Sequence, residues 1–205
     1  MCLGGGEEGV RTVEGRYGGS FGPCAEKGFQ DMQIPRMRIP VFVSSPSPDN
    51  MSPSQDSSAE IIHRLVRRYK LEWRTLGRSD YTNDLPLKEI LRMVRHCSGG
   101  IILGFEQFRA PTVELRAGSK NARTETGVSF ATPWNQLEAG ILFSAGLPIM
   151  IFREPNIRGG IFDVGNTEVF VHQIPTSTMS KQALDDLDSV FQNWVGRVRA
   201  HYYGD

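Results

Sequence analysis

The chain has 205 residues, enough for one domain with a sizeable core and a tail. Its 23 basic residues balance its 23 acidic residues, which argues against a nucleic-acid-binding surface or a polybasic membrane patch. Three irregularly spaced cysteines argue against a disulfide framework or a zinc site, and no apolar run has the length of a signal peptide or a membrane span. We therefore expect a cytoplasmic protein without a metal, a cofactor, or a nucleic-acid or membrane partner.

Residues 1–38 differ in composition from the rest of the chain. They are rich in glycine and show no apolar periodicity, which is typical of a flexible leader. Residues 39–205 alternate between short apolar runs and amphipathic stretches, so we expect them to form a single α/β domain.

Short apolar runs predict the strands of this domain. The runs at residues 39–44, 101–105 and 148–152 are typical of parallel strands buried on both faces. Weaker runs at 72–76 and 168–174 bring the sheet to about five strands. Because helical stretches separate the strands, we predict a flavodoxin-like, doubly wound parallel sheet with helices on both faces.

Two predicted helices have clear start signals in the sequence. Ser57 and Glu60 form a capping box for the first helix, and Asp84 is the predicted N-cap of the second. A further helix is predicted over residues 132–146. Because nearly all of its residues are apolar or small, we expect it to be buried on every side.

Polar segments follow the predicted strands, at the edge where α/β sheets bind their ligands. The loops at 44–50 and 77–84 are rich in groups that can hold a sugar or a phosphate, although an ordinary turn fits the first loop as well. The segment 106–131 is a long polar loop that leads into the helix at 132–146. Loops of this length are usually functional or mobile, so we expect a lid over the site; a surface insertion is the alternative.

Glu138 is the one carboxylate in the predicted helix 132–146. Carboxylates are rarely buried unless they have a partner or a chemical role. A carboxylate at this edge of an α/β sheet is therefore a candidate for catalysis. A Glu138 side chain that simply faces water explains the position equally well.

The pattern of Trp134, Glu138 and Gly140, followed by Gly146 and Pro148 where the helix gives way to a strand, resembles the nucleoside 2-deoxyribosyltransferase-like superfamily. It is also similar to the related TIR domains, which have a serine-rich first loop and a tryptophan shortly before a helix glutamate. The resemblance covers roughly residues 39–175 and fits both branches.

Both branches cleave an N-glycosidic bond, so the resemblance implies an N-glycosidase that acts on NAD+, a nucleoside or a nucleotide. In that case NAD+ is a substrate and not a cofactor. Glu138 would stabilise or attack the ribose carbon C1′, and Asp80 or Asp84 would protonate a neutral leaving base. Trp134 would lie beside the base. The resemblance also implies a homo-oligomer and a role of the kind seen in bacterial antiviral defence.

The alternative is a non-catalytic protein, either a sensor of a nucleotide signal or a self-assembling TIR-like scaffold. If the protein is an enzyme, Ser44 and Ser45 hold phosphate or ribose, while Arg78 and Asp80 bind phosphate and hydroxyl groups. The predicted catalytic residues are Glu138 and Asp80. The predicted substrate-binding residues are Ser44, Ser45, Arg78, Tyr81, Asp84, Phe105, Trp134 and Asn135.

Overall fold

The computed structural model describes residues 37–76, 86–165 and 169–204. The predicted leader at 1–38 therefore lies almost wholly outside the described residues, and so does Asp84, the predicted N-cap of the second helix. Within the described ranges, none of the helices combines the length and the apolar character needed to cross a lipid bilayer.

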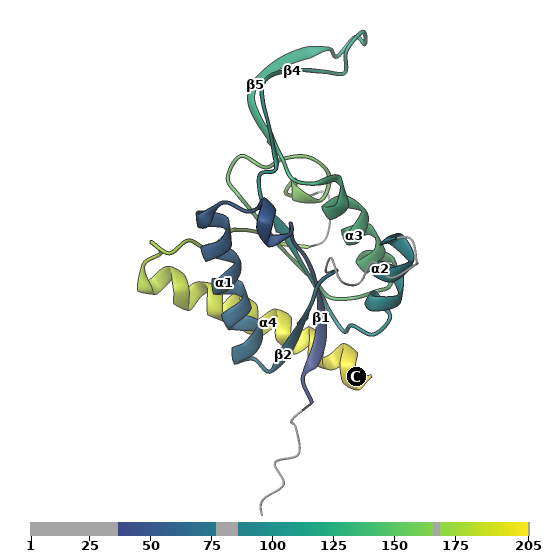
Figure 1. The fold of residues 1–205 in the computed structure, drawn as a ribbon, viewed down its shortest axis with the longest axis vertical. Coiled ribbons are helices and arrows are strands. Elements are labelled where there is room, and N and C mark those ends of the chain that lie inside the picture. Colours follow the sequence, from purple (N-terminus) through teal and green to yellow (C-terminus); the bar gives the residue numbers. More distant parts are fainter. Residues whose placement is uncertain (1–36, 77–85, 166–168, 205) are drawn as a thin grey trace, which may run out of the picture. The chain divides into compact units, whose positions relative to one another are not determined.

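Five parallel strands form the central sheet, in the order β2-β1-β3-β6-β7 (Figure 1). This is the flavodoxin-like order 2-1-3-4-5, so the predicted fold class is confirmed. The strands predicted at 72–76 and 168–174 are shorter than expected. The observed strands are β1 (Ile39–Ser44), β2 (Leu71–Arg74), β3 (Gly100–Gly104), β6 (Ile149–Arg153) and β7 (Val171–Gln173).

Helices cover both faces of the sheet (Figure 1). Because side chains alternate along a strand, Val41 and Val43 pack under one pair of helices and Phe42 packs under the other. The central strands β1, β3 and β6 are therefore buried and apolar along most of their length, as expected for strands covered on both faces. The helices are α1 (Pro53–Arg68) and α4 (Lys181–Tyr203) on one face, and α2 (Pro86–Val94) and α3 (Pro133–Ser144) on the other.

The predicted start of the first helix was wrong. Helix α1 begins at Pro53, and its capping box is formed by Ser52 and Gln55. The Gln55 N–H donates to the Ser52 hydroxyl at 3.3 Å, and the Ser52 N–H donates to the Gln55 side chain at 3.0 Å. Ser57 lies inside the helix, where its hydroxyl donates to the Pro53 carbonyl. A proline at the first helical position supports the earlier start.

The segment 106–131 is also not the loop that we predicted. Strands β4 (Phe108–Leu115) and β5 (Arg123–Phe130) form an antiparallel hairpin outside the main sheet, and the hairpin extends away from the sheet in Figure 1. The turn between the strands includes Gly118, whose φ of 70° suits glycine. The hairpin adds a separate two-stranded sheet to the flavodoxin-like core.

Helix α3 is buried on one side only, in contrast to the prediction. Trp134, Leu137 and Phe143 expose 46%, 42% and 66% of their surface. A helix in the outer layer of such a fold presents a single side to the sheet, so its opposite side stays apolar and exposed. The buried side chains of α3 are Asn135, Glu138, Ala139 and Leu142.

Candidate active site

A cavity of about 900 Å³ lies at the carboxyl ends of β1 and β2, beside the first turns of α3. Its volume falls within the range of about 300–1,000 Å³ that is typical of small-molecule sites. The order of the strands reverses at β1, and this is the point at which doubly wound sheets bind their ligands. The position of the cavity therefore matches the position expected from the fold.

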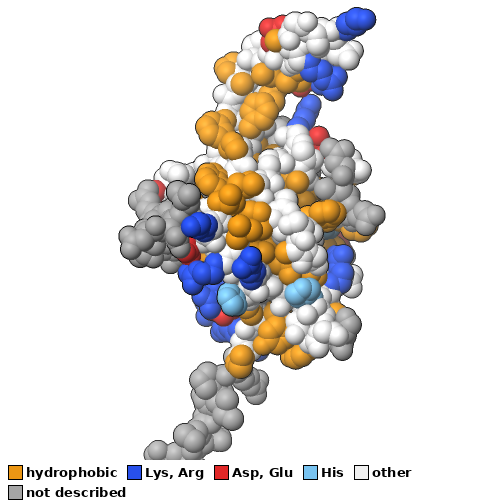
Figure 2. Space-filling model, turned by 90° about the vertical axis from the view of Figure 1, so that its right-hand side faces the viewer, with side chains coloured by type: hydrophobic (Ala, Val, Ile, Leu, Met, Phe, Trp, Pro, Cys, Tyr) orange, Lys and Arg blue, Asp and Glu red, His pale blue; other side chains and the backbone are white. Residues whose placement is uncertain are grey.

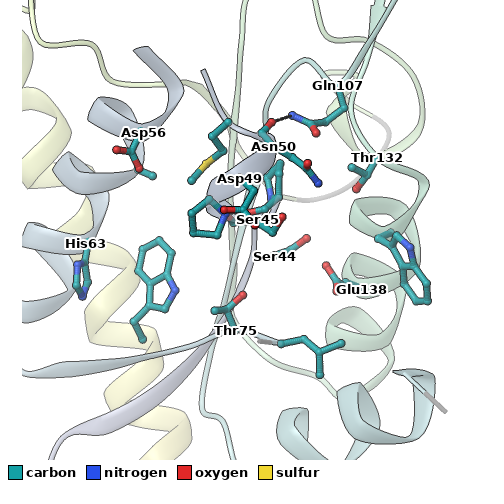
Figure 3. Close-up of a pocket in the computed structure, with 18 of the residues that line it drawn as sticks. Ser44, Ser45, Asp49, Asn50, Asp56, His63, Thr75, Gln107, Thr132 and Glu138 are labelled. Carbon is teal, nitrogen blue, oxygen red and sulfur yellow. Dashed lines mark hydrogen bonds between the residues drawn. The ribbon is translucent and has the colours of Figure 1, made fainter. Parts of the chain in front are cut away.

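Glu138 lies in the second turn of α3 and directs its carboxyl group into this cavity (Figure 3). Its side chain is 8% exposed. Burial raises the pKa of Glu138 to about 7, because a charged carboxylate loses water there, and a hydrogen bond with the Ser44 hydroxyl acts in the opposite direction. The carboxyl group is thus poised to change protonation state near neutral pH.

A chain of hydrogen bonds orients the Ser44 hydroxyl toward Glu138. The Asn135 side-chain amide donates to the Ser44 oxygen at 2.7 Å, which leaves the Ser44 proton for the bond with Glu138. The Thr132 hydroxyl in turn donates to the Asn135 side-chain oxygen at 3.0 Å. Ser44 and Asn135 are each 1% exposed, so this chain is held inside the protein and positions the carboxyl group.

Local sequence explains why these side chains meet. Thr132 is the N-cap of α3 and accepts a bond from the Asn135 N–H, with Pro133 in the first helical turn. Asn135 and Glu138 are three residues apart in the helix and therefore share one face. Ser44 is the last residue of β1, so it sits at the edge of the sheet that this face of α3 covers.

The loop after β1 forms the middle of the cavity wall. It contains a 3₁₀ turn, Pro48–Asn50, and the Ser45 hydroxyl donates to the Pro46 carbonyl at 2.9 Å. The Gln107 side chain donates to the Asn50 carbonyl at 3.2 Å (Figure 3). Gln107 precedes β4 and is the one residue of 106–131 that lines the cavity, so the hairpin does not form the predicted lid in this structure.

Partly buried polar groups hold the base of the hairpin, and with it Gln107, against the domain. The Glu154 carboxylate accepts from the Glu106 N–H and from the Gln55 side-chain amide. The Ser129 hydroxyl donates to the Glu106 carboxylate. These contacts join α1 and the residue after β6 to the two ends of the hairpin, before β4 and at the end of β5. They therefore fix the side of the cavity that Gln107 forms.

The far end of the cavity lies between α1 and β2. Figure 3 shows Asp56 and His63 on one side and Glu138 on the other, with Ser44 and Ser45 between them. Trp73 of β2 also lines this end, and its ring packs edge-on against His63 with a centroid distance of 5.3 Å. The cavity therefore has a carboxyl end and an aromatic end.

The described lining of the cavity is acidic. Asp49, Asp56, Glu60 and Glu138 line it, and among the described lining residues there is no lysine or arginine. In the part of the chain that the structure describes, no three side chains of the metal-binding types come together. An uncharged or cationic ligand suits such a lining better than a phosphate does.

The structure brings together only part of the predicted site. Ser44, Ser45, Trp134 and Glu138 line one cavity. Asn135 lies behind them, where it contacts Ser44 and positions its hydroxyl. Four predicted site residues, Arg78, Asp80, Tyr81 and Asp84, lie outside the described residues.

Phe105 is not at the cavity. It is fully buried and belongs to the core under α1 and α4. Phe105 follows the last residue of β3, and the alternation of strand side chains directs it into this core together with Leu103. The prediction placed it at the end of a strand correctly but did not resolve the face.

Several lining residues escaped the sequence analysis. Thr132 had a usable signal, because a hydroxyl residue before proline is typical of a helix start. Asp56, His63 and Trp73 had none, because their proximity depends on the packing of α1 beside β2. Gln107 likewise reaches the cavity only because the hairpin base is anchored there.

Comparisons with known proteins leave the family open. No protein-family model matches the sequence, and no curated protein matches it. Among solved structures, the chain is similar to the CMP N-glycosidase BcmB of Clostridium botulinum, with a TM-score of 0.41 and 12% identity over 73% of this chain and 98% of that one.

A second solved structure, the metal-soaked Flv1 flavodiiron core from Synechocystis sp. PCC6803, is similar with a TM-score of 0.44 and 10% identity. It covers 84% of this chain and 38% of that one. At these identities and TM-scores, neither likeness says which reaction this chain performs. The functional inference therefore rests on the site itself.

Proposed function

We propose that the protein is an N-glycosidase that cleaves the bond between ribose and base in a nucleoside or a related compound. The observation that carries the proposal is the Glu138 carboxyl group, which is 8% exposed, lines a cavity at the switch point of the sheet and is hydrogen-bonded to Ser44. A scaffold protein does not require a buried acid at this position. Strongly perturbed carboxyl groups in clefts are typical of catalytic sites.

In the proposed reaction, the bond between C1′ and the base nitrogen breaks and its electron pair leaves with the base. The ionised Glu138 carboxylate stabilises the positive charge that develops on the ribose, or forms an ester bond to C1′. Water then attacks C1′ and loses one proton to solvent or to the acid that protonated the base. The sugar gains a hydroxyl group, and Glu138 is released as a carboxylate. A neutral base also takes up one proton, for which Asp80 and Asp84 stay the predicted donors.

The hydrogen-bond chain behind Glu138 supports this role. Groups that act in a transition state work best when they are held in place before the substrate binds. Thr132 and Asn135 are bonded to each other, and Asn135 is bonded to Ser44, so the Ser44 hydroxyl keeps one orientation toward the carboxyl group. The carboxylate therefore does not need to reorganise during the reaction.

The charge of the cavity favours an unphosphorylated nucleoside over NAD+ or a nucleotide. Asp56, Glu60 and Glu138 line it, and no lysine or arginine is among the described lining residues. A phosphate group placed among carboxylates is repelled. The predicted phosphate-binding residue, Arg78, lies outside the described residues, and the substrate panel below includes nucleotides for this reason.

A second candidate function, a sensor or self-assembling scaffold, has one observation in its favour. The face that carries α2 and α3 gathers hydrophobic side chains (Figure 2). Exposed apolar patches often mark protein–protein contacts. The exposed large apolar residues on these two helices are Leu87, Leu91, Trp134, Leu137 and Phe143.

Base release measured by chromatography tests the proposal. Purified protein and a Glu138→Gln variant are incubated with nucleosides, their 5′-monophosphates and NAD+. We expect release from at least one nucleoside and a loss of about a hundredfold or more in the variant. The control is Glu114→Gln, an exposed glutamate on β4, which should react at the wild-type rate.

Two results would count against the enzyme. Release that is unchanged in Glu138→Gln would remove Glu138 from the mechanism. No release from any compound, at low and at high protein concentration, would overturn the N-glycosidase proposal, and light scattering would then test whether the protein assembles as a scaffold.

A further inference from the structure

The aromatic end of the cavity has no role in the reaction described above. We propose that the base of the substrate lies against Trp73, in a subsite formed with His63 and Asp56, and that this subsite selects bases that carry an amino group. The inference rests on the proposed function, since it assumes a nucleoside whose ribose lies at Glu138. It differs from the sequence-based expectation that the base lies beside Trp134.

Glu138 and Trp73 line one cavity, so a single ligand can contact both. Trp73 pairs with Val41 in the neighbouring strand, and Ser44 lies three residues further along β1, which is about 10 Å of extended chain. The Glu138 carboxyl group lies near Ser44 in the cavity. Val41 and Trp73 pack on the α1 side of the sheet, whereas Ser44 faces α3. The base of a nucleoside whose ribose lies at Glu138 therefore reaches Trp73 by passing over the carboxyl end of β1, within the one cavity that both residues line.

The Trp73 ring is held in place before any ligand binds. Its indole packs against His63 at an interplanar angle of 70° and against the core under α1, together with Met51 and Ala59. Trp134, by comparison, is 46% exposed and makes no ring–ring contact with other described residues. A ring that is already fixed costs less entropy to use in binding, so Trp73 is the better platform for a base.

Polar groups at this end indicate which bases fit. Asp56 lines the cavity from the first turns of α1, and within the described residues its carboxylate has no hydrogen-bond or ion-pair partner. A carboxylate accepts hydrogen bonds and donates none when ionised, and it pairs well with the amino group of cytosine. Adenine offers the same kind of donor. Uracil and hypoxanthine carry an oxygen in place of the amino group, which Asp56 would repel.

Equilibrium binding to the Glu138→Gln protein tests the subsite without turnover. The probes are two matched pairs, cytidine with uridine and adenosine with inosine, and affinity is measured by titration calorimetry. We expect the amino-bearing member of each pair to bind more tightly. Asp56→Asn, a change at an exposed position, should reduce that preference by roughly tenfold or more, in line with a hydrogen bond to a charged group.

Variants at the two tryptophans decide where the base lies. In the Glu138→Gln background, Trp73→Leu should lower the affinity for all four nucleosides by about five- to 150-fold, the range found when a stacking ring is removed. Trp134→Leu tests the competing position and should have the smaller effect. Phe143→Leu is the matched control, because Phe143 is 66% exposed on α3 and does not line the cavity. Circular dichroism checks that each variant is folded.

Each outcome bears on the subsite separately from the reaction. A larger loss for Trp134→Leu, equal losses, or no binding by any of the four nucleosides would overturn the subsite. If Trp73→Leu does not fold, the Asp56→Asn variant decides the question. The proposed subsite would be overturned if this variant still preferred nucleosides whose base carries an amino group. If binding depends on Trp73 and Asp56 but no base is released by the wild-type protein, the subsite stands and the N-glycosidase proposal fails.

Discussion

The burial of Glu138 has opposite consequences for stability and for reactivity. In the unfolded chain the pKa of Glu138 has its ordinary value of 4.5, whereas in the folded protein burial raises this pKa to about 7. Between these values the folded protein holds a proton that the unfolded chain has lost. The free energy of unfolding therefore falls by about 3 kcal/mol in total as pH rises from about 4.5 to about 7, and it stays at the lower value above pH 7.

We predict that Glu138→Gln is more stable than the wild type at pH 8.5, by up to about 3 kcal/mol, and that the difference nearly vanishes at pH 4.5. Glutamine has the shape of the protonated acid and never becomes charged. Urea denaturation at the two pH values measures the difference, and an advantage that does not change with pH would contradict the argument. The activity of the wild type should move the other way, with kcat/KM rising through pH 7 as Glu138 ionises.

At the residue scale, the sequence identified Glu138 but not its surroundings. A lone carboxylate in an apolar helix was a visible signal. Its contact with Ser44 was not, because the two residues lie on elements separated by most of the domain. The same holds for the hydrogen bond that the Asn135 amide donates to Ser44; the expectation that Asn135 binds substrate stays a prediction.

At the element scale, helix α1 shows how two equal signals compete. Ser52 with Gln55 and Ser57 with Glu60 both satisfy the capping-box pattern. Pro53, which is favoured in the first turn of a helix, supports the first of them, and the structure has the cap at Ser52.

We predict that Ser52→Ala lowers the free energy of unfolding by about 1 kcal/mol, because one backbone N–H loses its acceptor. Ser57→Ala is the matched control and should change stability by no more than about 0.5 kcal/mol, since Ser57 is exposed within the helix. Guanidinium denaturation of both variants measures this. Equal losses for the two serines would show that the cap at Ser52 does not stabilise the helix.

The sequence does contain a signal for the hairpin, namely alternating apolar and polar residues in both of its strands. Val113 and Leu115 alternate with polar residues before the Gly118 turn, and Val128 and Phe130 do so after it. This is the two-residue period of a strand. The segment was predicted as a loop because its polar content outweighed its periodicity.

At the scale of the whole molecule, the position of α3 on the sheet decides where Glu138 lies. A Cβ atom at Gly100 of β3 would meet Leu142 of α3 at 2.4 Å, and Leu142 is fully buried. The helix therefore packs closely on the strand because Gly100 has no side chain. Gly140, on the exposed side of the same helix, has nothing within 4 Å of such an atom.

We predict opposite effects at these two glycines. Gly100→Ala should destabilise the protein by about 1–3 kcal/mol through overpacking and reduce base release by displacing α3. Gly140→Ala should stabilise it by up to about 1 kcal/mol, because alanine is the better helix former. Thermal unfolding and base-release assays measure both. A melting temperature that shifts in the same direction for the two variants would refute the packing argument.

The sequence by itself determined the class of the fold. Apolar runs such as 39–44 and 101–105, separated by helical stripes, can bury their surfaces only as a parallel sheet between helices. Right-handed connections reduce the number of possible sheet topologies, and the structure shows the order β2-β1-β3-β6-β7. The same patterns placed Ser44 and Glu138 at the carboxyl edge of that sheet, where the structure has them.

Only the tertiary structure decided which side chains share the cavity. Periodicity identifies a residue's face on its own element, but contacts between elements depend on how the elements pack. The structure brings Trp73 and His63 together beside β1, and it places Gln107 there through the hairpin base. It also directs Phe105 into the core. Burial, which raises the pKa of Glu138, is likewise a property of the packed domain, because it exists only once α3 has covered the edge of the sheet.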